Sequence, residues 1–181
     1  LGYNAYQSST GKYGFVTCGH AVSVGTEVKR PGLLWFDTTL GKVTKRQLSG
    51  KIDAAFVPYD DQSNKTTYSN TGYNITGTYS SSDITEGMNV TKYGRTTGLQ
   101  QGKVADATTT VNVDGIAFSD QAEIDIRQEG GDSGAPVVFN YIGPIQAGET
   151  RTSTLLGIAT IADSTWETAY ISKAANINSQ F

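Results

Sequence analysis

The sequence predicts an all-β protein, and three features of its 181 residues support this fold class. Short strand-like runs recur at even spacing along the chain, with turn residues between them. The 21 glycines and 10 tyrosines, together with abundant Ser, Thr and Asn, suit strands and tight turns. Only residues 172–179 have a helical pattern. Many short strands joined by turns are typical of a β-barrel or a β-sandwich.

The first half of the sequence predicts a hairpin and four further strands. Turn residues from Ser8 to Gly11 separate the hairpin strands, and Pro31-Gly32 separates the next pair. The expected strands cover residues 2–9, 13–17, 26–29, 32–36, 41–49 and 52–58. A polar stretch follows at residues 64–82. We expect a link near residues 76–86, and therefore an N-terminal part of residues 1–80 and a C-terminal part of residues 81–181.

The second half predicts further short strands and one closing helix. The expected strands cover residues 88–92, 102–107, 109–113, 115–118, 122–127, 137–141, 155–162 and 168–171. A turn at residues 94–98 follows the first of them. Ser172 is the expected N-cap of the helix at residues 172–179, because a serine side chain can accept a hydrogen bond from the first helical turn.

The segment from Gly130 to Gly134, with Asp132 and Ser133 inside it, has the composition of a serine nucleophile turn. A serine hydroxyl is a poor nucleophile and needs a neighbouring base. It also needs N–H groups aimed at the charge that develops on the attacked carbonyl, and the main-chain N–H groups of Gly131 and Ser133 are the expected donors. The alternative is an ordinary glycine-rich turn between two strands, since short motifs recur by chance.

The base and its orienting group are expected in the first half. His20 is the only histidine, and it follows an apolar strand that ends in small residues. Asp53 stands at the head of the apolar strand at residues 52–58, where it could accept a hydrogen bond from the second imidazole nitrogen. Taken alone, each residue has a plainer interpretation, a packed histidine and a turn aspartate. The occurrence of His20, Asp53 and Ser133 together, each at a strand end, favours a catalytic triad.

Four segments give the chain a resemblance to a known family. They are Gly-Phe-Val-Thr-Cys-Gly-His at residues 14–20, Ile-Asp-Ala-Ala-Phe-Val at 52–57, Tyr-Gly-Arg-Thr-Thr-Gly at 93–98 and Gly-Asp-Ser-Gly at 131–134. In this order they resemble segments of the chymotrypsin-like serine proteases, and most closely the secreted bacterial branch that includes alpha-lytic protease and the streptogrisins. One departure is that Ala21 occupies the place where relatives usually carry a cysteine.

The resemblance implies two antiparallel six-stranded β-barrels packed face to face, with a short C-terminal helix. His20 and Asp53 would come from the first barrel and Ser133 from the second, with the active site between them. The strand that contains Ala159, Thr160, Ile161 and Ala162 is similar to the strand that binds the substrate backbone in antiparallel fashion. At the equivalent of Thr160, relatives place a serine that supports the catalytic aspartate. The alternative for this stretch is a plain core strand.

Two questions about charged residues near Ser133 have more than one answer from the sequence: the partner of Asp132 and the residue at the base of the specificity pocket. The resemblance implies that Asp132 is a buried carboxylate with a cationic partner, for which Lys92 and Arg95 are the candidates; both could equally be solvated surface cations. The base of the specificity pocket is either Asp125, which would select Lys or Arg, or Arg127, which would favour acidic residues. The two could also pair with each other, because strand alternation places them on one face. We expect small or medium apolar side chains, since Ala162 narrows the pocket where relatives often have glycine.

Composition excludes several classes of protein. A formal net charge of −3 gives no electrostatic case for nucleic acid binding. No apolar run approaches the roughly 20 residues needed to cross a membrane. No cluster of metal-ligating residues is visible, and we expect no metal and no cofactor. The expected partner is a protein or peptide substrate, and the expected state is a monomer.

The single cysteine, Cys18, excludes an intrachain disulfide, and we expect it to be a small buried side chain rather than a catalytic thiol. Few cysteines alone would favour the cytoplasm. The resemblance implies a secreted, extracellular protein instead, whose chain begins after the removal of a signal peptide. Asn-Xaa-Ser/Thr sequences at Asn64, Asn74 and Asn89 could carry glycans only in a eukaryotic secreted protein.

The leading hypothesis is therefore a serine endopeptidase that acts through an acyl-enzyme. Two alternatives stay open. One is a catalytically silent, protease-like binding module. The other is an unrelated β-sandwich binding protein, which predicts exposed aromatic platforms and no convergence of His20, Asp53 and Ser133.

Overall fold

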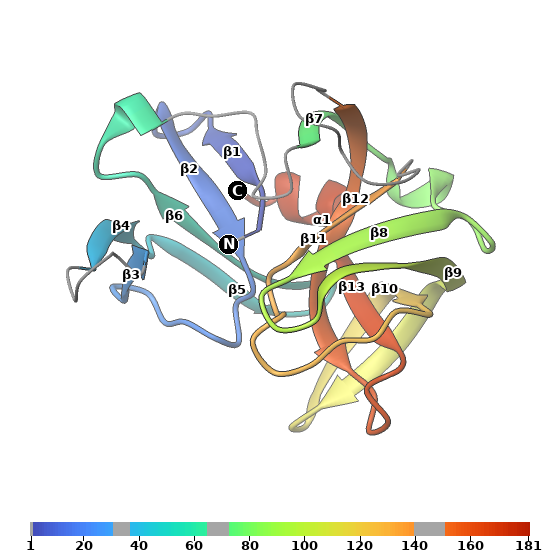
Figure 1. Cartoon of the computed structure of the whole chain (residues 1–181). Coiled ribbons are helices and arrows are strands. Elements are labelled where there is room, and N and C mark those ends of the chain that lie inside the picture. The colour runs from blue at the N-terminus through green and yellow to red at the C-terminus, as the bar shows by residue number, and fades with distance from the viewer. Residues whose placement is uncertain (1, 31–36, 65–72, 140–150) are drawn as a thin grey trace.

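The computed structural model describes residues 2–30, 37–64, 73–139 and 151–181, and it has an all-β fold with one short α-helix. The predicted fold class is thus confirmed. The strand expected at residues 32–36 and the end of the strand expected at 137–141 lie outside the described residues. Figure 1 shows the strands in two groups, with β1 to β6 on one side and β8 to β13 on the other.

The first group contains six strands in two sheets. Its strands are β1 (Asn4–Gln7), β2 (Lys12–Thr17), β3 (Glu27–Arg30), β4 (Thr38–Lys42), β5 (Lys45–Ser49) and β6 (Ile52–Pro58). A four-stranded sheet has the order β1-β2-β6-β5, and β3 pairs with β4 as a separate ribbon. The strand expected at residues 41–49 is divided between β4 and β5. The ribbon packs on the sheet at Gly41, where a side chain would collide with the main chain of Pro58.

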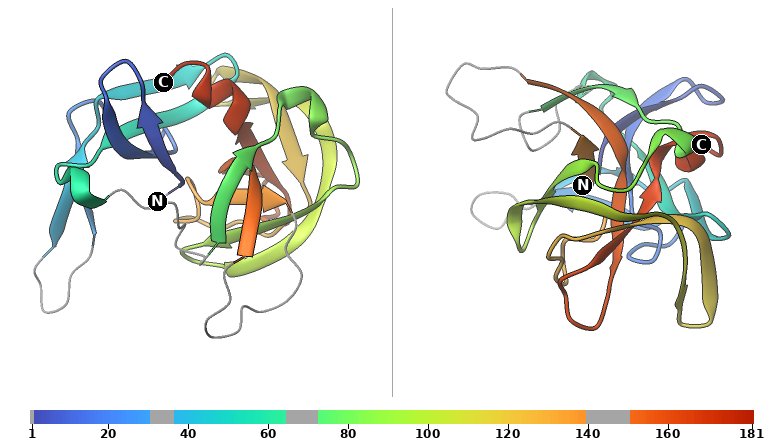
Figure 2. Two further views of the ribbon diagram at one scale, coloured as in Figure 1. Left: turned by 90° about the horizontal axis from the view of Figure 1, so that it is seen from above. Right: turned by 90° about the vertical axis from the view of Figure 1, so that its right-hand side faces the viewer.

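The second group forms a closed ring of six antiparallel strands. Its strands are β8 (Asn89–Gly94), β9 (Gly98–Val113), β10 (Ile116–Ile124), β11 (Pro136–Phe139), β12 (Arg151–Ala162) and β13 (Ala169–Lys173). The order β11-β8-β9-β10-β13-β12 closes because β12 also pairs with β11. The expected strands at 102–107 and 109–113 are one long strand, β9, whose partner β10 shifts register instead. Figure 2 shows this group from two further directions.

The connection between the groups contains β7 (Tyr73–Thr78) and two short 3-10 helices, Gln62–Asn64 and Ser81–Asp83. β7 pairs in parallel with β12 of the second group. It therefore belongs to the larger sheet, although the expected boundary at residue 80 placed it in the first half. The pairing partner, rather than the polar composition of this stretch, decides where β7 lies.

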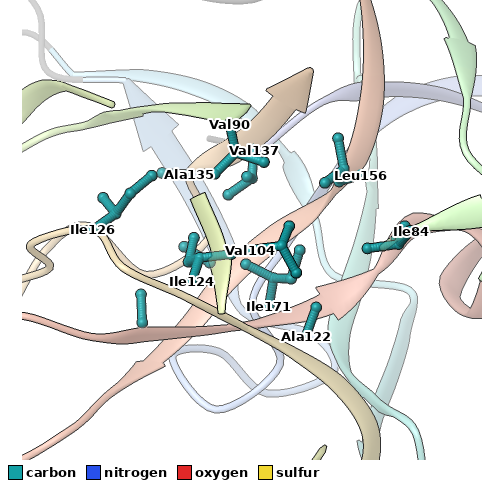
Figure 3. Close-up of a cluster of buried hydrophobic side chains, with 12 residues drawn as sticks. Ile84, Val90, Val104, Ala122, Ile124, Ile126, Ala135, Val137, Leu156 and Ile171 are labelled. Carbon is teal, nitrogen blue, oxygen red and sulfur yellow. The ribbon is translucent and has the colours of Figure 1, made fainter. Parts of the chain in front are cut away.

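Three apolar clusters hold the molecule together. One fills the ring of the second group, with Val104, Ile124, Val137 and Ile171 among its members (Figure 3). A second belongs to the first group and contains Phe15. The third joins the two groups, because its members come from β2, β6, β11, β12 and the helix. All seven residues of β6 are buried, since β6 faces both neighbouring clusters.

The C-terminal helix α1 (Ala174–Asn178) follows β13 directly and lies between the two groups (Figure 2). It begins two residues later than expected, and its N-cap is Lys173, without a capping side-chain hydrogen bond. The expected role of Ser172 as a cap is therefore wrong. Ser172 lies in β13 and is fully buried, so its hydroxyl serves partners in the interior.

Candidate active site

His20 and Asp53 form a direct pair. Nδ1 of His20 lies 2.6 Å from Oδ2 of Asp53, and the main-chain N–H of His20 donates to Oδ1 at 2.8 Å. The Asp53 side chain is only 2% exposed, whereas that of His20 is 39% exposed. Since both carboxylate oxygens are occupied by one residue, Asp53 fixes the ring orientation and leaves Nε2 as the free ring nitrogen.

The surroundings of His20 favour its charged form. Its hydrogen bond to Asp53 is the main cause that raises the pKa of His20 from 6.5 to about 10, and a hydrogen bond with the Cys18 thiol adds to the effect. Burial opposes both. Cys18 is buried and free, as expected, and its effect on the pKa of His20 was not predicted.

The nucleophile turn packs against the strand end that carries His20. Gly134 has a φ of +88°, and a side chain on it would lie 2.7 Å from Oγ1 of Thr17 and 3.2 Å from the amide nitrogen of Cys18. Only glycine fits this position without strain. The residue after Ser133 is therefore in contact with the segment two to three residues before His20, which brings the three expected triad residues into one region.

The hydroxyl of Ser133 donates to the main-chain oxygen of Thr160 at 3.1 Å. Its neighbours in the turn are anchored, because the N–H of Asp132 donates to Glu129 and that of Gly134 to Ala159. Among the described residues, the N–H groups of Gly131 and Ser133 donate to no protein group. These two groups are the ones expected to bind an oxyanion, and nothing within the described chain occupies them.

The buried side chain of Asp132 anchors the nucleophile turn. Its carboxylate lies 3.0 Å from Nζ of Lys92, and both side chains are fully buried. Thr96 and Thr97 donate further hydrogen bonds to it, at 2.7 Å from the Thr96 N–H and 2.7 Å from the Thr97 hydroxyl. Of the two candidate partners, Lys92 forms the pair and Arg95 is exposed.

Burial and pairing act in opposite directions on this ion pair. Burial alone would raise the pKa of Asp132, but the hydrogen bonds from Thr97, Lys92 and neighbouring amides lower it to about 2. Burial lowers the pKa of Lys92, against the effect of Asp132. A second bond from Lys92 Nζ to the Arg127 carbonyl, at 2.8 Å, satisfies another of its donors.

The four residues expected to bind substrate lie near the end of β12. Ala159 and Thr160 are buried, whereas Ile161 and Ala162 are half-buried. The pairing of β12 with β11 ends at Ile158, so that edge of Thr160 to Ala162 has no strand partner within the described chain. The Thr160 hydroxyl donates to the Tyr170 carbonyl at 3.1 Å and not to Asp53, because the neighbouring strand β13 supplies the nearer acceptor.

A cavity of about 240 Å³ lies beside His20 and Asp53. Thr160 and Ile161 border it from β12, and the remaining lining comes from Leu48 and the β9–β10 hairpin. Thr160 thus borders the cavity and also accepts the hydrogen bond from the Ser133 hydroxyl.

The two candidates for the pocket base do not pair with each other. Arg127 forms an ion pair with Glu129 at 2.5 Å, and both Asp125 and Arg127 are exposed. The buried residues of this segment are Ile126 and Gln128, and the N–H of Gln128 donates to the Trp166 carbonyl. The side-chain oxygen of Gln128 has no hydrogen-bond partner among the described residues. The sequence predicted roles only for the charged residues of this segment and did not predict the burial of Gln128.

Within the described ranges, no group of three or more His, Cys, Asp or Glu side chains is placed to hold a metal ion. In the same part of the chain, no helix has both the length and the apolar character needed to cross a membrane.

No protein-family model and no curated protein sequence matches the chain. Solved structures do match. Nocardiopsis Protease (NAPase) is 24% identical with a TM-score of 0.72, over 99% of this chain and 88% of that one. Thermobifida fusca Protease A is 21% identical with a TM-score of 0.72, over 99% of this chain and 86% of that one. The chain has the chymotrypsin-like serine protease fold.

A glutamic acid specific serine protease has the same fold at 22% identity and a TM-score of 0.72, over 98% of this chain and 87% of its own. The resemblance seen in the sequence is thus confirmed at the level of the fold. The alternative of an unrelated β-sandwich is wrong, because the six strands of the second group close into a ring. The structure also places Ser172 against the main chain of Asp53 and Gln121 beside Ser172, whereas the sequence predicted only a helix cap at Ser172 and no role for Gln121.

Proposed function

We propose that the protein is a serine endopeptidase in which His20, Asp53 and Ser133 form the catalytic triad. The observation that carries this proposal is the His20–Asp53 pair beside a Ser133 turn whose two expected oxyanion donors are unoccupied. A buried carboxylate that binds an imidazole through one oxygen and the main-chain N–H of the same histidine through the other has the geometry needed to orient a general base.

In the proposed reaction, Ser133 attacks the peptide carbonyl while Nε2 of His20 accepts the hydroxyl proton. His20 does so in its neutral form, which alkaline pH favours because the pKa of His20 is raised. Asp53 stabilises the resulting imidazolium, and the N–H groups of Gly131 and Ser133 bind the oxyanion, each worth roughly 3 kcal/mol in related sites. His20 then gives the proton to the leaving amine. Water, deprotonated by His20, attacks the acyl group and releases Ser133 with its hydroxyl restored.

We propose that the substrate binds as an extra antiparallel strand along Thr160 to Ala162, the unpaired edge of β12. The buried side chains of the adjoining segments, which include Ile126, Gln128 and Ala159, are uncharged, so we propose small or medium uncharged residues on the acyl side of the cleaved bond. One solved relative is described as binding substrate through a histidine triad. This chain has one histidine and cannot build that triad.

The chemistry requires only these side chains and water, so we propose no cofactor. The partner is a protein or peptide substrate. We further propose that the protein acts as an extracellular monomer, and that residues 1–80 and 81–181 form one integrated protease unit.

One observation favours a second function, a binding module without catalysis. The Ser133 hydroxyl donates to Thr160 and, among the described hydrogen bonds, not to His20. In a catalyst this bond must exchange for one to Nε2 when substrate binds, whereas in a binding module it would persist.

Replacement of Ser133 by alanine separates the two functions. We expect Ser133→Ala to lower kcat about a million-fold on a fluorogenic peptide, because the triad acts as a unit. Thr165→Ala removes an exposed hydroxyl that donates to Asp163 and to no triad residue, so it is the matched control and should keep full activity. More than about a tenth of wild-type activity in Ser133→Ala would overturn the triad assignment.

A further inference from the structure

The turn that leads into Asp53 is held by the second group of strands. The N–H of Ser119 in β10 donates to the Gly50 carbonyl at 2.8 Å. The Gln121 side-chain amide donates to the Lys51 carbonyl at 2.9 Å, and Nζ of Lys51 lies 3.1 Å from the Asp120 carboxylate. Figure 1 shows β5 and β6 running from the first group toward β13 and β10 of the second.

β10 is irregular where it makes these contacts. Its register against β9 shifts between Phe118 and Gln121, and Asp120 has a φ of +52°. A non-glycine residue in this conformation costs free energy and persists only where its surroundings hold it. Here Lys173 and Lys51 bind the Asp120 carboxylate, at 2.6 and 3.1 Å. The irregular segment thus presents Gln121 to the interior, where it is fully buried.

A buried chain of hydrogen bonds runs from Gln121 to Asp53. The main-chain N–H of Asp53 donates to the Ser172 hydroxyl at 3.1 Å, and that hydroxyl donates to Oε1 of Gln121 at 2.9 Å. The Gln121 amide uses its nitrogen for the Lys51 and Ser119 carbonyls, at 2.9 and 2.8 Å. The Asp53 N–H can only donate and Oε1 of Gln121 can only accept, so the Ser172 hydroxyl between them must accept from the first and donate to the second.

We propose that Gln121 and Ser172 are positioning residues that set the Asp53–His20 pair against Ser133, an inference that rests on the proposed function. His20 and Asp53 belong to the first group of strands, while Gln121, Ser172 and Ser133 belong to the second. Proton transfer from Ser133 to His20 requires these groups to meet within hydrogen-bond reach. The hydrogen bonds through Gln121 and Ser172 join the main chain of Asp53 to the second group of strands, which carries Ser133.

Loss of either side chain breaks the hydrogen bonds that connect Asp53 to the second group of strands. Ser172→Ala leaves the Asp53 amide buried without an acceptor, and Gln121→Met removes the acceptor for Ser172 and the side-chain donor to the Lys51 carbonyl. A small displacement of a catalytic group, of about 1 Å, can cost roughly 100-fold in rate. We therefore expect each variant to lower kcat between about 10-fold and 100-fold, with KM within about twofold of wild type.

The test compares four proteins: wild type, Ser172→Ala, Gln121→Met and Ser153→Ala. Ser153 is the matched control, because it is equally buried and its hydroxyl has no hydrogen-bond partner among the described residues. Peptide hydrolysis gives kcat and KM, and NMR gives the titration of the single histidine. Ser172→Ala and Gln121→Met should lower the pKa of His20, because its bond to Asp53 is the main cause that raises it. Ser172→Thr keeps the hydroxyl and should restore most of kcat.

Folded Ser172→Ala and Gln121→Met proteins with wild-type kcat and a wild-type His20 titration would overturn the inference. Lower melting temperatures with unchanged kcat and titration would do the same, because they would show a structural role only. If Ser172→Ala fails to fold, Gln121→Met carries the same test. If wild type hydrolyses no peptide, the proposed function fails, and the His20 titration in the variants still decides whether Gln121 and Ser172 position Asp53.

Discussion

Two buried aspartates belong to the proposed active site, one as a member of the triad and one beside Ser133. They differ in the exposure of their partners. Asp53 pairs with His20, whose side chain is 39% exposed and borders the cavity beside β12. Asp132 pairs with Lys92, whose side chain is fully buried. Both carboxylates also accept main-chain N–H groups, from His20 and from Thr96.

The exposure of the cationic partner distinguishes a pair that can take part in a reaction from a pair that only stabilises the structure. A cation that reaches the cavity can exchange protons with a substrate, whereas a cation sealed in the interior can only hold its partner in place. In the proposed function, Asp53 orients the group that reacts, and Asp132 fixes the backbone that presents Ser133 and the N–H groups around it. We expect substitutions at the first pair to change rate and substitutions at the second to change stability.

The largest expected effect is on turnover at the first pair. Asp53→Asn should lower kcat about ten-thousand-fold, because an amide supports the wrong imidazole tautomer. The variant should still fold, and thermal unfolding near pH 10, where the His20–Asp53 pair has lost its contribution to stability, should show a melting temperature close to that of wild type. NMR should also show a lower pKa for His20. A melting temperature that falls as far as in the Lys92 variant below would erase the distinction between the pairs.

The next effect is on stability at the second pair. Lys92→Met leaves the Asp132 carboxylate buried without its cation, and we expect a loss of about 3–5 kcal/mol in the free energy of unfolding. Lys42→Met is the matched control, since Lys42 forms an exposed ion pair with Glu27 at 3.3 Å and should contribute about 1 kcal/mol or less. Urea unfolding measures both. Equal stability of the two variants would contradict the assigned role of Lys92.

A smaller effect appears in the pH dependence of stability, where the pairs act at opposite ends. The pKa of His20 is raised from 6.5 to about 10, so its pair stabilises the fold fully below pH 6.5 and loses this contribution as pH rises toward 10. The pKa of Asp132 is lowered from 3.8 to about 2, so its pair stabilises above pH 3.8 and loses this contribution as pH falls toward 2.

Urea unfolding across pH 2 to 10 checks both slopes. Asp53→Asn should remove most of the alkaline slope and leave the acid slope in place. An unchanged alkaline slope in that variant would show that another group, not His20, is responsible.

The sequence was sufficient for the parts of the site that depend on local pattern. Glycines around Ser133 and an apolar strand before His20 have periodic or turn signatures, and Lys92 was one of two cations within reach of Asp132. Features that depend on contacts between distant parts of the chain could not be predicted. Ser172 has the pattern of a helix cap, but the closure of β13 against β10 buries it beside Asp53. Likewise β7 has a polar, linker-like sequence, and only its parallel partner β12 makes it a strand of the larger sheet.

The most direct test of the triad is covalent labelling with a fluorophosphonate probe, followed by peptide mass spectrometry. We predict one adduct per chain on Ser133, with its rate greatly reduced in His20→Ala, because the hydroxyl reacts only when His20 takes its proton. The rate in Thr165→Ala should match wild type. No adduct on folded wild-type protein, or an adduct on another residue at the same rate in His20→Ala, would contradict the assignment of a serine nucleophile activated by His20.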